Sequence, residues 1–128
     1  MIPSTVRIFL CTEPVDMRLG FDRLAAAARS RLGIDPQGGE VLVAFANRGA
    51  TRLKLLWFDR NGYCLLYKRL HRALFALPQP ADAGDVAVRL DGRGLATLLA
   101  GVDRPSARHR LGNSFARARH TLTLVPAR

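Results

Sequence analysis

The stretch TRLKLLWFDRNGYCLLYKRLHRALFALP, residues 51–78, decides the fold. Two apolar runs, at 53–58 and 63–70, flank the dipeptide Asn61-Gly62. Asn-Gly is a strong hairpin signal, because a two-residue type I′ turn needs a positive φ at both central positions. The stretch therefore predicts a β-hairpin that turns at Asn61-Gly62.

This turn fixes a predicted register, in which Phe58 faces Leu65 and Lys54 faces Arg69. The middle of the hairpin is apolar on both faces, as in a central strand pair. The end far from the turn is basic, and like charges opposite each other destabilise a strand pair. An anionic partner or solvent would relieve that repulsion.

Length and composition indicate one globular domain. The chain has 128 residues and is 48% hydrophobic, which is enough to bury a core. No apolar run approaches the ~20 residues of a membrane span, and the first residues do not resemble a secretory signal, so we expect a cytoplasmic protein. Cys11 and Cys64 fall in predicted strands, where buried, reduced thiols are expected.

The balance of basic and acidic residues indicates what class of molecule the chain could bind. The chain has 20 Lys+Arg against 10 Asp+Glu, a net charge of +10, and all but two of the basic residues are arginine. A small, strongly basic protein is a candidate for nucleic-acid contact. Two plainer explanations stay open: a GC-rich genome favours arginine over lysine, and net charge keeps a protein soluble.

The remaining periodicity predicts an α+β fold with an antiparallel meander packed against about two helices. Strands are expected at 6–11, 41–46 and 86–90, and residues 41–70 form the three-strand meander. Asp16 is a plausible N-cap for a helix over 17–32, in which Gly20 marks a late start or a close backbone approach. Asp91 caps a second helix with apolar residues at 95, 98, 99 and 102. Residues 71–77 add a fourth strand or are irregular.

The composition changes after Asp103. Residues 104–128 contain six arginines, two histidines and no acid. We therefore divide the chain into an α+β domain, 1–103, and a basic C-terminal tail, 104–128, in which 121–125 could form a strand. Such a tail is either a nucleic-acid-binding arm or a flexible, solvated segment.

Motifs for catalysis, metals and cofactors are absent from the sequence. It has no glycine-rich phosphate loop, HExxH, CxxC or GxSxG. A metal-dependent nuclease would need clustered carboxylates, and the candidates are Asp16, Asp22 and Asp59. Their spacing favours local roles as caps, turn residues and arginine partners. We predict no enzyme activity, no metal and no cofactor.

Three ordered motifs resemble a known family. DMRLGFDRLAAAA at 16–28, RLKLLWFDRNGYCLLYKRL at 52–70 and LATLLAGVD at 95–103 are similar to motifs of the small TnpB, or Orf2, proteins of the insertion-sequence-66 transposons. After the second motif the family continues E-x-G-R-F-x-W-P, whereas this chain has HRALFALP at 71–78. The motifs cover roughly residues 6–103.

The resemblance implies an accessory factor in transposition, encoded beside a larger transposase and without an established enzymatic activity. We therefore expect contact with transposon DNA or with the transposase–DNA complex. Seven basic residues are the predicted phosphate contacts: Arg48, Arg52, Lys54, Lys68, Arg69, Arg72 and, secondarily, Arg18. Two alternatives are a protein–protein adaptor that docks on the transposase, or on a second copy, without touching DNA, and a small metal-dependent nuclease. The oligomeric state is not predicted.

Overall fold

The predicted hairpin forms the outer part of a five-stranded sheet in a computed structural model that describes residues 5–103. Its strands are β3, Arg52–Asp59, and β4, Gly62–Arg69. The basic tail and the strand expected at 121–125 lie outside the described residues. The fold class, α+β, is confirmed.

The sheet has the strand order β4-β3-β2-β1-β6. The meander of β2 (Val41–Ala46), β3 and β4 is antiparallel, as predicted. The first strand, β1 (Arg7–Cys11), runs parallel to β2 and antiparallel to β6 (Ala87–Leu90), so the sheet is mixed. This parallel pair is possible because α1 crosses over between the two strands.

The predicted hairpin register is wrong by two residues. Asp59 pairs with Gly62, Phe58 with Tyr63, and Lys54 with Tyr67, so the turn is centred on Arg60-Asn61 and Arg60 takes a φ of 57°. Because the side-chain period of a strand is two, the slip leaves every side chain on its predicted face. The observed register replaces the Lys54–Arg69 pair with an Arg52–Arg69 pair and places Lys54 Nζ 4.8 Å from the centre of the Tyr67 ring.

The first helix begins later than the Asp16 cap predicted. Asp16 Oδ1 accepts a hydrogen bond from the Arg18 backbone N–H, which closes a local turn instead of a helix. The helix α1, Phe21–Ala27, starts after Gly20 and continues as a π-helical turn, η1, at Ala28–Leu32. Gly20 therefore marks a late start, and Gly33 ends the helix in the left-handed conformation, φ 68°.

A short 3₁₀ turn, η2 (Pro36–Gly38), then leads into β2. The second helix, α2 (Gly92–Ala100), is capped as predicted, with the Asp91 carboxylate accepting from the Gly94 N–H at 2.7 Å. Residues 71–77 do not add a strand to the main sheet. They contribute the two-residue β5, Ala73–Leu74, which pairs with β7, Val102–Asp103.

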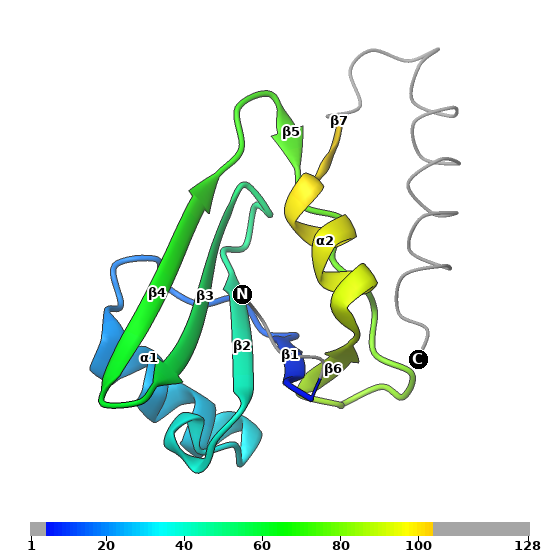
Figure 1. Cartoon of the computed structure of the whole chain (residues 1–128). Helices are drawn as coiled ribbons and strands as arrows, with labels where there is room; N and C mark the ends of the chain where they lie inside the picture. Colours follow the sequence, from blue (N-terminus) through cyan, green and yellow to red (C-terminus); the bar gives the residue numbers. More distant parts are fainter. Residues whose placement is uncertain (1–4, 104–128) are drawn as a thin grey trace, which may run out of the picture.

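Each face of the sheet carries its own core, and Figure 1 shows the two helices on opposite sides of the sheet. Leu95 and Leu98 of α2 pack with Leu53 and Leu55 on one face. On the other face, Leu24 of α1 packs with neighbours that include Val43, Phe45 and Leu56. Cys11 is buried, Cys64 is half-buried, and both are free thiols. Within residues 5–103, no helix is long and apolar enough to cross a membrane.

Candidate nucleic-acid interface

Four exposed arginines lie at one end of the sheet, and we call them the basic end: Arg48, Arg52, Arg69 and Arg72. They come from the β2–β3 turn, the first residue of β3, the last residue of β4 and the loop before β5. Two hydrogen bonds hold these segments together, from Leu70 N–H to Thr51 O (2.9 Å) and from Phe75 N–H to Ala50 O (2.7 Å). In Figure 1 this end lies near β5 and β7, opposite the β3–β4 turn.

Arg52 and Arg69 are direct cross-strand neighbours in the ladder of β3 and β4. With Tyr67 they line a small surface cavity of about 230 Å³. The salt bridges within residues 5–103 involve other arginines, namely Arg18, Arg29 and Arg31. The guanidinium groups of the basic end are therefore available to an anion, and their planar N–H donors suit phosphate or carboxylate oxygens.

Lys54 does not belong to this exposed set. Only 7% of the residue is exposed, and its Nζ donates to the Leu19 carbonyl at 2.8 Å while lying over the Tyr67 ring. The ammonium group joins β3 to the segment that leads into α1. Its burial removes the solvent access that a phosphate contact needs.

Lys68 is half-buried and has a comparable role on the opposite face. Its Nζ donates to the Leu99 carbonyl at 2.8 Å. Leu99 lies in the last turn of α2, where carbonyl groups lack helical partners and the helix dipole favours a cation. Lys68 thus joins β4 to the C-terminal end of α2.

Arg18 lies apart from the basic end and is neutralised locally. Its guanidinium binds the Asp16 carboxylate, with Nη2 2.7 Å from Oδ2. The side-chain and backbone hydrogen bonds from Arg18 lower the pKa of Asp16 from 3.8 to about 2, and the charges of Arg18 and Lys54 act in the same direction. The same ion pair raises the pKa of Arg18.

The three carboxylates named for a nuclease do not converge. Asp16 is paired with Arg18, Asp22 lies in the first turn of α1, and Asp59 ends β3. Within the described part of the chain, no group of three or more His, Cys, Asp or Glu side chains could hold a metal ion.

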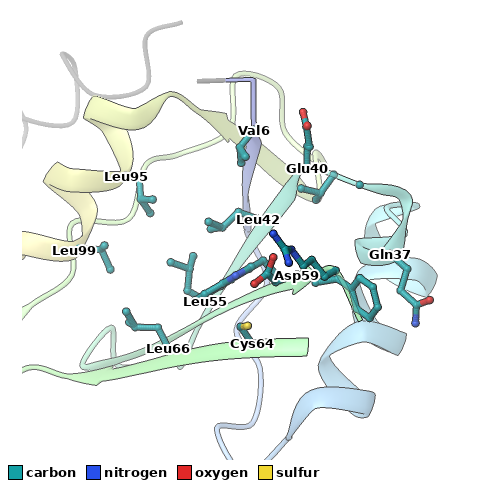
Figure 2. A pocket seen from close by; sticks show the side chains of 15 residues that line it. Val6, Gln37, Glu40, Leu42, Leu55, Asp59, Cys64, Leu66, Leu95 and Leu99 are labelled. Carbon is teal, nitrogen blue, oxygen red and sulfur yellow. The ribbon is translucent and has the colours of Figure 1, made fainter. Parts of the chain in front are cut away.

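An apolar groove of about 710 Å³ was not foreseen from the sequence. It lies where α2 leaves the turn-proximal half of β3 and β4 uncovered, and Figure 2 shows Leu95 and Leu99 pointing from α2 toward Leu55 and Leu66. Trp57 and Cys64 complete its floor, while Glu40, Asp59 and Arg60 lie at its polar rim. The apolar run at 63–70 predicted a core strand, and nothing in it indicated that Leu66 would stay exposed.

Comparisons with known proteins agree with the motifs. The family described as "IS66 Orf2 like protein" matches residues 6–109. The chain is 38% identical over 105 residues to "Uncharacterized protein y4hO" of Sinorhizobium fredii, covering 80% of this chain and 88% of that one. It is 34% identical over 98 residues to "Uncharacterized protein y4jC" of the same organism, covering 77% and 80%. No solved structure matches the chain.

Proposed function

Because the chain belongs to the IS66 Orf2-like family, which has an accessory role in transposition, we propose that it is a non-catalytic factor that contacts transposon DNA through the basic end. The observation that carries the proposal is the position of Arg48, Arg52, Arg69 and Arg72. Four segments of the chain bring these exposed arginines to one end of the sheet, outside the salt bridges of the described residues.

Such a surface binds the phosphate backbone rather than the bases. Arginine contacts to phosphate release condensed counterions, so affinity falls with salt by a log–log slope of about −0.9 per phosphate contacted. Phosphate contacts position a protein on a duplex without reading its sequence, so we propose no base recognition by the basic end. The proposed role is therefore to hold DNA, or the transposase–DNA complex, by shape and charge. Lys54, Lys68 and Arg18 are left out of the contact set because their cationic groups already have protein partners.

The test is a salt titration of binding to a labelled duplex, followed by fluorescence anisotropy. The double variant Arg52→Ala/Arg69→Ala should weaken binding and reduce the magnitude of the salt slope by about 2. The matched control is Arg23→Ala/Arg93→Ala, which removes the same charge from exposed positions on α1 and α2. Equal losses in the two double variants would mean that only net charge matters, and would reject the basic end as the site.

The adaptor alternative uses the same arginines, since an acidic surface of the transposase offers carboxylates instead of phosphates. It predicts no duplex binding at physiological salt, together with capture of the transposase that survives nuclease treatment. Loss of that capture in Arg52→Ala/Arg69→Ala, but not in the control variant, would assign the basic end to protein docking.

A further inference from the structure

The strand β4 is an open edge of the sheet. It is the outermost strand, has eight residues, and is twice as long as β6 at the other edge. Because Leu70 N–H bonds to Thr51 O, the alternation of an antiparallel ladder directs the backbone groups of Leu70, Lys68, Leu66 and Cys64 toward β3. The N–H and C=O groups of Tyr63, Leu65, Tyr67 and Arg69 therefore point away from the sheet. Within residues 5–103, no strand pairs with them.

This edge lacks the usual protection against pairing. Natural edge strands are short or carry proline, lysine or a bulge. The six residues from Gly62 to Tyr67 contain no charge and no proline, and β4 pairs with β3 at every position from Gly62 to Arg69. Leu66 and Tyr67 are 39% and 49% exposed, on opposite faces. The one lysine of β4 directs its ammonium to Leu99 O instead of away from the edge.

We propose that β4 pairs with β4 of a second copy, antiparallel about a two-fold axis, to form one continuous ten-stranded sheet. A two-fold axis through Leu65 or Leu66 preserves the faces of both sheets, since it pairs residues whose numbers differ by an even count. The outward N–H and C=O groups of Tyr63, Leu65 and Tyr67 then bond across the axis. This inference is independent of the proposed DNA contact.

The charges of β4 fit a second copy in this orientation. With the axis at Leu65 or Leu66, Lys68 faces Gly62 or Cys64 of the other copy, and Arg69 faces Asn61 or Tyr63. No like charges become direct neighbours. The basic end of each copy also comes to lie beside the turn end of the other, where exposed Asp59 and Arg60 together carry no net charge.

The apolar surface beside β4 also favours pairing with a second copy. Leu66 faces Leu66 or Cys64 across the axis, on the face where each copy has its groove. The two grooves would then adjoin, and the exposed side of Leu66 would be covered by a neighbour of the same kind. The pairing satisfies edge backbone groups and buries apolar surface together, as β-strand addition does in other proteins.

The first experiment is sedimentation velocity of the full chain at concentrations up to about 100 μM, where mass action reveals a reversible dimer. We expect a dimer mass for the wild type. Leu66→Lys should weaken the dimer at least roughly tenfold, because the two-fold brings the new lysines close together. The control Phe21→Lys adds the same charge at an exposed position on α1 and should leave the dimer intact. A wild type that stays monomeric throughout would overturn the proposal.

A second variant removes an outward N–H group of the edge, together with the Tyr67 ring next to Lys54. Tyr67→Pro deletes an N–H that points away from β3, so the β3–β4 ladder is kept while the edge is blocked. We expect a folded monomer by circular dichroism and sedimentation. A dimer that withstands both Leu66→Lys and Tyr67→Pro would show that another surface is used.

A cross-link gives a positive result that does not depend on weakening the dimer. In a Cys64→Ser background, Leu66→Cys should form a disulfide-linked dimer on mild oxidation if the axis lies at Leu66, since facing strand positions bring Cα atoms within disulfide range. If the axis lies at Leu65, Leu66→Cys should instead cross-link to Cys64 of the other copy when Cys64 is kept. Phe21→Cys in the Cys64→Ser background should stay monomeric. Equal cross-linking of the two variants would indicate random collision.

Discussion

At the residue scale, the side chains of both lysines join neighbouring elements of the fold. Each Nζ donates at 2.8 Å to a carbonyl in a different element: Lys54 to Leu19, and Lys68 to Leu99. A sequence reading assigned both to DNA because their charge and position beside Arg69 suited phosphate. Periodicity alone does not tell whether a lysine on a strand turns toward solvent or toward a nearby carbonyl, since that depends on which helix covers the strand.

Replacing Lys54 tests this structural role. Lys54→Met keeps the length of the side chain but leaves the Leu19 carbonyl without its donor, so we expect a loss of about 1–3 kcal/mol of unfolding free energy in urea denaturation. Lys68→Met, at a half-buried position, should cost less, about 0.5–1.5 kcal/mol. Neither change should alter the salt slope of DNA binding. A reduced slope with unchanged stability would instead make the lysine a DNA contact.

The Asp16–Arg18 pair predicts an acid-dependent loss of stability. The folded pKa of Asp16, about 2, lies below its ordinary 3.8, so the stabilisation is present above pH 3.8 and is lost as the pH falls toward 2. Asp16→Asn should therefore be less stable than the wild type at neutral pH, and the difference should shrink across that window. Urea denaturation at a series of pH values measures it. A difference that stays constant with pH would contradict the linkage.

At the scale of elements, Gly101 fixes how α2 meets the small β5–β7 sheet. It adopts a φ of 74°, and an added Cβ would lie 2.7 Å from Leu70 Cδ1 and 3.1 Å from the Leu74 carbonyl oxygen. The leucine side chain can move, but the backbone oxygen cannot move without shifting β5. The glycine is therefore required both by its conformation and by the space around it.

Gly101→Ala should lower the free energy of unfolding by about 1–3 kcal/mol, because strain at a positive φ adds to the clash. Gly92→Ala is the matched control: it lies in α2, meets nothing within 4 Å and has no positive φ. It should be neutral or slightly stabilising. Equal effects of the two substitutions in urea denaturation would rule out a special role for Gly101.

The elements also show which features of the fold can be predicted from local sequence patterns. The hairpin, its faces, the meander and the Asp91 cap follow from turn residues and periodicity, and all of them are present. The register does not follow from the Asn-Gly pair alone. Pairing Lys54 with Tyr67, and Phe58 with Tyr63 at 5.1 Å between ring centroids, outweighs the preferred turn and leaves a positive φ on Arg60. The groove was equally hidden from local patterns, because it depends on how much of the sheet the nine-residue α2 covers.

At the scale of the whole molecule, the net charge of +10 works against folding. Arg52 faces Arg69 directly, and within the described residues neither has a salt-bridge partner. Added salt screens such repulsion over about 10 Å at 0.1 M. We therefore expect the thermal midpoint to rise by a few degrees between low and moderate NaCl.

The matched variant is Arg69→Gln, which removes one of the facing charges. It should be slightly more stable than the wild type at low salt, and the two should converge as salt increases. Differential scanning calorimetry measures both effects. A midpoint that falls with salt would mean that attractive ion pairs dominate the surface.

The two occupied lysines have a practical consequence for chemical labelling. Apart from the α-amino group, Lys54 and Lys68 are the only primary amines of the chain, and each Nζ is held by a carbonyl. Acylating reagents should therefore react slowly with the native protein and quickly once β3 or β4 separates from its neighbour. The acylation rates at Lys54 and Lys68, resolved by mass spectrometry, would report separately on the opening of the α1 face and the α2 face of the sheet.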